Sequence, residues 1–349
     1  MREPSSVNRA LIAVVAVVAL VMLGIGVRLA VLNGAPAEEG PSPSTVTVAP
    51  VDAFTGLELH EGERPSYVAI VVENSPSARP QRGLSRASLV YEVPAEGGIT
   101  RFIACYSAPQ EGPVGPVRSI RPYMVTIARS HGAPLVHCGG SSDALKLARQ
   151  LSYPTVDELR SGSGSGFWRD AARHMPHNLY TGADQLTRRL ADDGIATDGG
   201  TTGFVYASSK TGLKKLPGSV ACTAIGAKAG AGYSVDWGFD NSLGRFIRSV
   251  NNRVDCDADG GAQIAVDNVV FMFVPCRIVD EEGRLELAIE GSGRALVASG
   301  GVAVEGRWER HGSGPFRLLD LGMNDVKLAS GRTWVHVVDT STRVSVTGR

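Results

Sequence analysis

Short apolar runs alternate with polar turns from about Arg64 onward, and amphipathic segments separate some of these runs. Apolar runs of four to eight residues bounded by turn residues are typical of buried strands. We therefore predict strands over 67–72, 89–94, 100–107 and 134–138. Apolar residues at helical spacing predict helices over 122–132, 142–151 and 182–194. This mixture predicts an α/β (α+β) domain over residues 63–215.

The pattern changes after about Leu216, where helical periodicity disappears. Runs such as "DNVVFMFVP" and "TWVHVV" are short, rich in β-branched and aromatic residues, and in several cases separated by glycine-rich turns. We predict a second, smaller, β-rich domain over residues 216–349.

The most apolar segment lies at the N-terminus, where Ala10 to Val27 are 18 uncharged residues. This length is about the minimum that spans a bilayer, and two arginines precede the segment. We predict a cytoplasmic head over 1–9, a single-pass transmembrane signal-anchor over 10–32 and a flexible Pro- and Ser-rich linker over 33–62. The alternative is a signal peptide cleaved near Ala37, which would release a secreted protein. Both interpretations place the bulk of the chain outside the bacterial plasma membrane.

Charge and cysteine content exclude several kinds of partner. Lys plus Arg and Asp plus Glu both number 35, so no basic field for nucleic acid is expected. The five cysteines have no CxxC spacing, and His174 and His177 lack a third ligand, so we expect neither a metal nor a cofactor. Outside the cytosol, Cys222 is the best-placed disulfide partner for Cys256 or Cys276.

Charged residues gather at the ends of the predicted strands between Glu73 and Arg121. Strand alternation places Glu92 on the face of Val90, opposite Tyr91. The Gly97-Gly98 turn predicts a hairpin that brings Glu96 close to Arg101. Two more arginines, Arg118 and Arg121, stand just before a helix that is expected to begin at Pro122.

Two interpretations of this charged group remain open. Converging guanidinium groups bind phosphate or carboxylate, and a neighbouring Glu could serve as a general base. The alternative is a set of structural ion pairs that hold the loops to the sheet. Farther along the chain, His177 and Asn178 in "RHMPHNLYT" have the character of a site-lining loop.

Three motifs together carry a resemblance to a known family: "VVENSPSARPQRGLSRASLVYEVPAEGGITRF", "GPVGPVRSIRPY" and "RHMPHNLYT". They resemble the YerB-like family of extracytoplasmic bacterial lipoproteins, and the resemblance extends over about residues 64–340. It implies a two-domain envelope protein tethered outside the membrane, and it implies no reaction. The lipid-attachment cysteine of that family is absent here, and a hydrophobic segment takes its place. The family signature falls on Glu73, Asn74, Arg79, Pro80, Gln81, Glu92, Glu96, Gly97, Gly98, Arg101, Arg118, Arg121, Pro122, His177 and Asn178.

From these observations we predict a membrane-tethered protein that binds a polar or anionic envelope ligand, such as a cell-wall fragment or a peptide. The predicted binding residues are Asn74, Arg79, Gln81, Glu96, Arg101, Arg118, Arg121, His177 and Asn178. One alternative is a hydrolase of cell-wall glycan or peptide bonds. Its candidate acid and base residues are Glu73, Glu92, Glu96 and His177. The other alternative is a scaffold that holds an envelope protein partner through the β-rich domain.

Overall fold

The computed structural model describes residues 50–107, 112–161, 166–207, 213, 216–229 and 232–348. The predicted cytoplasmic head, the signal-anchor and residues 33–49 of the predicted linker lie outside these ranges. Helices of the length and apolarity needed to cross a membrane do not occur in the described part of the chain. The described residues belong to one compact unit.

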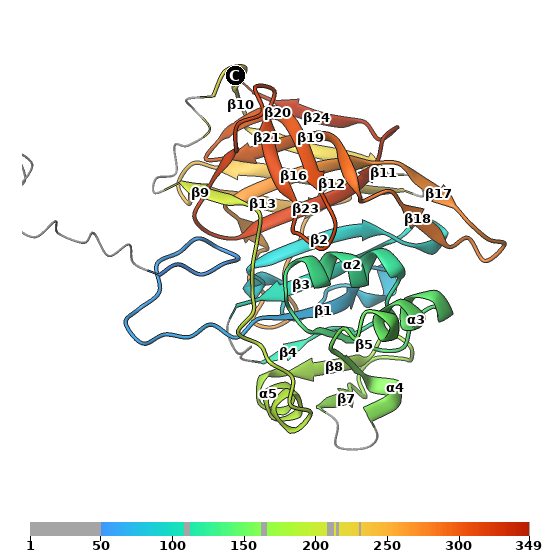
Figure 1. Ribbon diagram of the computed structural model, residues 1–349. Helices are drawn as coiled ribbons and strands as arrows, with labels where there is room; N and C mark the ends of the chain where they lie inside the picture. The colour runs from blue at the N-terminus through green and yellow to red at the C-terminus, as the bar shows by residue number, and fades with distance from the viewer. Residues whose placement is uncertain are drawn as a thin grey trace, which may run out of the picture. The chain divides into compact units, whose positions relative to one another are not determined.

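An eleven-stranded sheet forms the centre of this unit and draws on both halves of the chain (Figure 1). The first half contributes β1 (Val68–Glu73), β2 (Leu89–Pro94), β3 (Thr100–Tyr106), β5 (Leu135–His137) and β6 (Thr155–Asp157). The second half contributes β10 (Val220–Ala221), β16 (Asn268–Val274), β19 (Gly291–Ser299), β20 (Val302–Arg310), β21 (Arg317–Asp320) and β23 (Thr333–Asp339). The strand order is β10-β20-β19-β16-β23-β2-β3-β1-β5-β6, with β21 beside β20.

The two halves join where β2 pairs with β23. This pairing is parallel and runs from Leu89 opposite Thr333 to Glu92 opposite His336. On its other side β2 forms the predicted antiparallel hairpin with β3. All residues of β2 from Leu89 to Val93 are buried, as expected for a strand that is covered on both faces.

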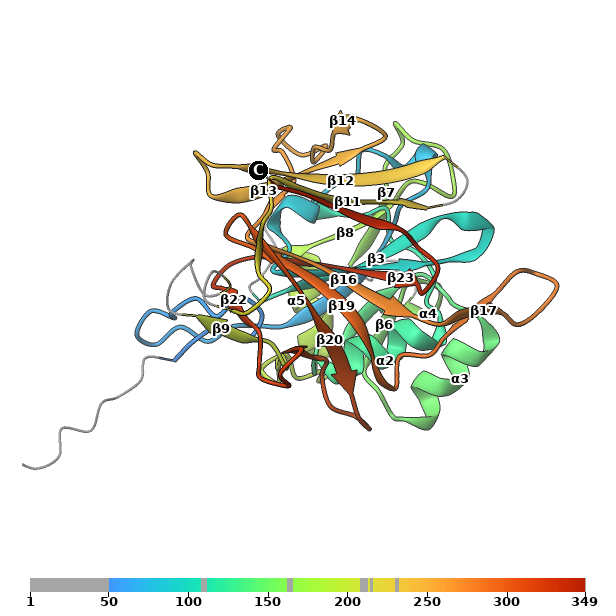
Figure 2. The ribbon, with the colours of Figure 1, turned by 90° about the horizontal axis from the view of Figure 1, so that it is seen from above.

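Different layers cover the two faces of this sheet (Figure 2). Helices α2 (Pro122–Ser130) and α3 (Ser142–Gln150) lie on one face. A six-stranded sheet lies on the other, formed by β11 (Ala224–Ala229), β12 (Tyr233–Asp240), β13 (Arg245–Val250), β14 (Arg253–Val254), β15 (Ala265–Val266) and β24 (Val344–Thr347). Strand alternation builds two cores: Val71 packs in the core with Ile127 of α2, and Val72 packs in the core with Trp237 of β12.

Smaller elements complete the unit. They are β4 (Pro113–Val114), β7 (Phe167–Arg169), β8 (Leu179–Gly182), β9 (Val205–Ala207), β22 (Lys327–Ala329), the hairpin of β17 (Cys276–Ile278) and β18 (Leu285–Leu287), α4 (Glu158–Ser161) and α5 (Ala183–Asp192). Three short 3-10 turns lie between the first strands: η1 (Pro76–Ala78), η2 (Leu84–Arg86) and η3 (Glu96–Gly98).

Most of the elements predicted from the sequence are confirmed, and their ends agree within two residues. The described part of the second half contains strands and no α-helix, as predicted. The whole unit is mostly β with few helices, so α+β describes it better than α/β. The folded part also starts earlier than residue 63, because Phe54 is fully buried and packs edge-on against Tyr67.

All five cysteines are free thiols, so the expected pairing of Cys222 is not present.

Candidate functional site

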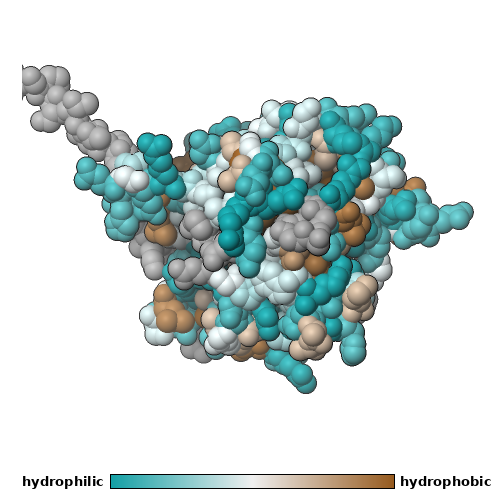
Figure 3. Space-filling view, turned by 90° about the horizontal axis from the view of Figure 1, so that it is seen from below, coloured by the Kyte–Doolittle hydropathy of each residue, from teal (hydrophilic) through white to brown (hydrophobic). Residues whose placement is uncertain are grey.

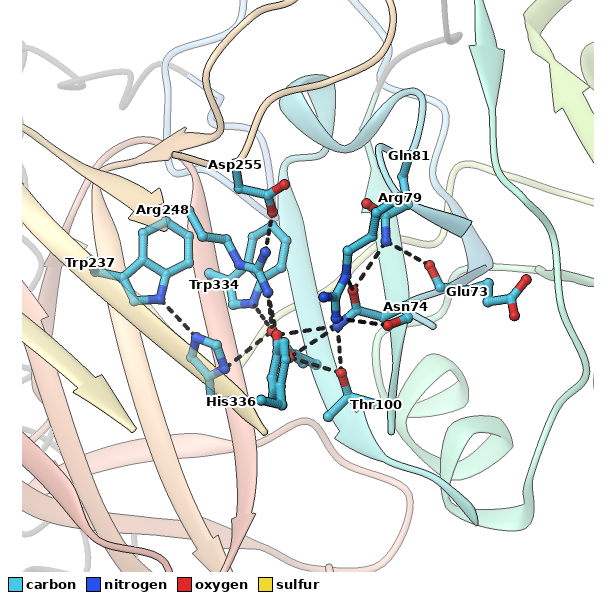
Figure 4. A network of polar contacts seen from close by, with 12 residues as sticks. Glu73, Asn74, Arg79, Gln81, Thr100, Trp237, Arg248, Asp255, Trp334 and His336 are labelled. Atoms are coloured by element: carbon cyan, nitrogen blue, oxygen red, sulfur yellow. Dashed lines mark hydrogen bonds and ion pairs between the residues drawn. The ribbon is translucent and has the colours of Figure 1, made fainter. Parts of the chain in front are cut away.

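Glu92 lies in a buried polar cluster between the two sheets. Its neighbours Arg248, Trp334 and His336 are labelled in Figure 4. Its Oε2 accepts from Arg248 Nη2 at 2.9 Å and from Trp334 Nε1 at 3.2 Å, and His336 Nδ1 lies 3.3 Å away. Its Oε1 accepts from Thr100 Oγ1 at 2.9 Å and from the Tyr233 hydroxyl. The predicted face of Glu92 is therefore correct, and its partners come from both halves of the chain.

The charge of this cluster is fixed by its hydrogen bonds. Burial by itself raises the pKa of Glu92, but Arg248, His336 and the hydroxyl donors outweigh burial and lower that pKa to about 2. Burial lowers the pKa of His336 to about 4, so its ring is neutral. The ring accepts from Trp237 Nε1 at 2.9 Å and therefore presents its Nδ1–H to Glu92. This carboxylate is ionised, and both of its oxygens already accept hydrogen bonds. It therefore has a structural role and is poorly suited to proton transfer.

The loop after β1 forms a second group of contacts. Asn74 Oδ1 accepts from Arg79 Nε at 2.9 Å and from Gln81 Nε2 at 3.1 Å. Arg79 also donates to the Asn74 carbonyl at 2.9 Å, and its guanidinium lies 5.0 Å from the centre of the Tyr233 ring. Asn74 Nδ2 reaches Thr100 Oγ1 at 2.7 Å, which links this loop to the Glu92 cluster.

Glu73 forms the third group, at the end of β1. Although this residue is almost fully buried, its carboxylate contacts two partly exposed side chains, Arg118 and His177. Arg118 binds both carboxylate oxygens, each at 3.2 Å, and His177 Nδ1 lies 2.9 Å from Oε1. Ser75 Oγ donates to the same oxygen at 2.7 Å. Asn178, next to His177, instead binds backbone carbonyls and accepts from Arg169 at 3.1 Å, which is a loop-holding role.

Glu96 forms the fourth group, at the turn between β2 and β3. Arg121 binds its carboxylate through Nε and Nη2, and Arg101 Nη2 approaches at 3.4 Å. Arg101 also donates from Nη1 to the Ser119 carbonyl at 2.9 Å, whereas its buried Nε has no hydrogen-bond partner among the described residues. The predicted proximity of Glu96 and Arg101 is confirmed.

The predicted residues thus converge at one end of β1, β2 and β3, but they do not form one pocket. A cleft of about 1440 Å³ opens beside them, between the two sheets. Of the predicted site residues, its lining includes Glu92 and none of the arginines. Groups of three or more His, Cys, Asp or Glu able to hold a metal ion are not found in the described ranges.

Sequence reasoning missed Arg248, Tyr233 and His336. A signal for Arg248 was available, because alternation in "RFIRSV" places it on the same strand face as Phe246, which is fully buried. An arginine on a buried face requires a carboxylate partner. Nothing local indicates that this partner is Glu92.

Comparisons with known proteins agree with this architecture. Residues 54–196 match the family described as "Protein of unknown function (DUF3048) N-terminal domain", and residues 225–335 match its "C-terminal domain". "Putative lipoprotein YerB" of Bacillus subtilis (strain 168) is 30% identical over 290 residues, which is 82% of this chain and 85% of that protein. The crystal structure of YerB protein from Bacillus subtilis superposes with a TM-score of 0.75 at 27% identity, covering 85% of this chain and 99% of that chain.

Proposed function

The chain belongs to the two-domain YerB-like DUF3048 family, and from its geometry we propose that it is a binding protein of the bacterial envelope that takes an anionic ligand. The resemblance seen in the sequence motifs is thereby confirmed. The relative's description as a lipoprotein supports a place outside the plasma membrane. Here the apolar segment over 10–32 would serve as the tether in place of a lipid.

The binding site in this proposal is the arginine cluster, defined as Arg101, Arg118 and Arg121 with Glu73, Glu96 and His177. Three guanidinium groups share two carboxylates, so the cluster carries an excess of positive charge. Anionic groups such as phosphate and carboxylate match paired guanidinium groups well.

The observation that carries the proposal is the state of Arg101. Its side chain is nearly buried, and burial and the neighbouring Arg121 lower its pKa. One of its N–H groups has no acceptor, and an unpaired buried donor costs about 1–3 kcal/mol. A ligand anion placed among the three arginines would offset the excess charge.

Isothermal titration of the full chain in mild detergent tests this proposal, with phosphorylated sugars, muropeptides and short acidic peptides as ligands. We expect Arg118→Gln and Arg121→Gln to weaken binding of the best anion at least tenfold, which corresponds to about 1.4 kcal/mol. Arg277→Gln is the matched control, because Arg277 lies on the β17–β18 hairpin, pairs with Glu286 and is 75% exposed. Equal affinity in all variants would refute the arginine cluster as the site.

A second candidate function, hydrolysis of a cell-wall bond, is favoured by one observation at His177. Glu73 accepts from His177 Nδ1, so the other ring nitrogen, Nε2, is left to accept a proton. No hydrogen bond to this Nε2 occurs within the described ranges. A carboxylate that orients an imidazole in this way is a common arrangement for a general base. Turnover of muropeptides that His177→Gln abolishes without loss of folding would establish this function.

The face drawn in Figure 3 is the lower side of the molecule in Figure 1, where α5 and β7 of the first half lie, and it offers little for docking another envelope protein. This face is mostly hydrophilic, and its hydrophobic residues are scattered in small groups. Contiguous apolar patches are the usual mark of a protein-docking surface. A scaffolding partner would have to bind through the strands of the second half instead, and we place ligand binding first because of the arginine cluster.

A further inference from the structure

The cleft between the two sheets is distinct from the arginine cluster. Its volume of about 1440 Å³ exceeds the roughly 300–1,000 Å³ of most small-molecule pockets. It opens where β2 turns into β3, and strands β11, β12 and β24 of the six-stranded sheet form the opposite wall.

Aliphatic side chains contribute to each wall of the cleft, beside a similar number of polar and charged ones. Ala95 and Ile99 come from the β2–β3 turn, Val235 and Val344 come from the six-stranded sheet, and Leu285 comes from β18. Tyr233 and His336 provide the aromatic rings in the lining. Sugar-binding sites rely on exposed aromatic faces, whereas aliphatic walls favour a hydrocarbon chain.

The polar groups at the bottom of the cleft already have hydrogen-bond partners within the protein. The Tyr233 hydroxyl donates to Glu92 and accepts from Arg248 at 2.7 Å and from Asn74 at 3.2 Å. Both ring nitrogens of His336 have partners, as described above. A ligand that reaches the bottom of the cleft therefore contacts groups whose hydrogen bonds are already made.

Charged side chains line the cleft near its open side. Lys228 and Arg343 are exposed and form no ion pair within the described ranges, and Asp236 is the half-buried acid opposite them. Arg294 is already paired with Glu305 at 2.6 Å. Asp339 also lines the cleft, but its carboxylate already accepts from the Cys276 and Ser341 N–H groups and from Ser341 Oγ. Lys228 and Arg343 are thus the lining cations without an ion pair in the described ranges, which favours an acidic head group.

The β17–β18 hairpin adds an apolar entrance. Figures 1 and 2 both show this hairpin projecting from the body of the molecule. Ile278, which also lines the cleft, is 69% exposed, and the adjacent Val279 is 50% exposed. Exposed aliphatic side chains at the mouth of a cleft suit a ligand that arrives from an apolar phase.

We propose that the cleft between the sheets binds an anionic amphipath, with its hydrocarbon chain between the sheets and its acidic head at Lys228 and Arg343. A fatty acid and a prenyl phosphate share this chemistry. Ile278 forms part of the entrance for the chain. This site is separate from the anion site of the arginine cluster.

Photolabelling of the full chain in nanodiscs tests the proposal. One arm uses palmitate with a mid-chain diazirine, and the other uses farnesyl phosphate with a diazirine on its chain. Peptides containing Val235, Ile278 or Val344 are expected to carry the label, and an excess of the unlabelled amphipath is expected to compete it away. The arm with stronger competed labelling identifies the head group.

Three variants of the chain test whether the label depends on the cleft and on its two cations. Ile99→Trp fills the cleft, and we expect cleft labelling to fall at least tenfold. The double variant Lys228→Gln/Arg343→Gln keeps the walls, and we expect labelling to fall about fivefold or more, since two surface charges are lost. Arg277→Gln lies outside the lining of the cleft and is expected to label as the unchanged chain does.

Two results would overturn the proposal. One is label that stays on these peptides in the presence of excess unlabelled amphipath. The other is equal labelling of the Ile99→Trp chain, the double variant and the unchanged chain. Circular dichroism of each variant verifies that its fold is intact, and the double variant tests the proposal even where Ile99→Trp disturbs the turn.

Discussion

Arg248 and Glu92 stand 156 positions apart, and Arg248 Nη2 donates to Glu92 Oε2 at 2.9 Å. Both side chains are at most 2% exposed. Arg248 belongs to the six-stranded sheet and Glu92 to the central sheet, so this ion pair connects the two layers. The guanidinium also binds Asp255 and lies 4.7 Å from the centre of the Trp334 ring.

Removing one member of this pair should be costly. We expect Arg248→Met and Glu92→Gln each to lower the free energy of unfolding by about 3–5 kcal/mol, because each leaves a buried charge without its partner. The double variant should lose less than the sum of the single losses. Urea unfolding of the four chains measures this coupling, and additive losses would show that the pair does not interact as described.

Stability should fall as the pH is lowered from 7.5 to 5. Burial lowers the pKa of His131 and of His336 from 6.5 to about 4. The unfolded chain therefore binds more protons than the folded chain between pH 6.5 and 4, so stability decreases as the pH falls through this window. We expect a loss of about 2 kcal/mol for each histidine at pH 5.

The neighbours of the two histidines support this direction. His131 donates from Nδ1 to the Thr201 carbonyl at 2.9 Å and accepts from the Tyr91 hydroxyl at 2.8 Å, so an additional proton on Nε2 would leave the Tyr91 O–H without its acceptor. His336 would likewise lose its bond from Trp237. Urea unfolding at pH 7.5, 6 and 5 tests the prediction. An equal free energy of unfolding at all three values would contradict it.

Glu96→Gln should reduce stability by about 1–3 kcal/mol. Neutral Gln cannot pair with Arg121 and Arg101, and it leaves positive charge on a partly buried surface. Glu286→Gln is the matched control, since it removes a carboxylate from the exposed pair with Arg277 and should cost at most about 1 kcal/mol. Thermal unfolding compares the two, and equal losses would mean that the arginine cluster does not depend on Glu96.

The two halves of the chain should fail to fold apart from each other. A fragment that ends at residue 207 keeps α2 and α3 but exposes the face of β2 that the six-stranded sheet covers and the edge that normally pairs with β23. Exposed edges and apolar faces promote aggregation. We expect each half alone to be insoluble and the two to recover solubility when they are co-expressed. A soluble fragment 50–207 with a cooperative unfolding transition would contradict this expectation.

Local features of the sequence were enough to place most of the elements. Alternation placed Glu92 on the correct face of β2, and the Gly97-Gly98 turn predicted the hairpin to β3 correctly. Pro122 correctly marked the start of α2, which places Arg121 beside Glu96. These features depend on residues that are close in the chain, so their physical cause is present in the sequence itself.

The tertiary structure alone decided how the two halves combine. The parallel pairing of β2 with β23 joins residues such as Leu89 and Thr333, and parallel strands have no short connecting turn that a sequence pattern could reveal. The same long-range pairing brings Trp334 and His336 to Glu92, and the packing of the second sheet brings Arg248. Burial of these groups away from water fixes their charges, and burial is a property of the packed layers rather than of any one segment.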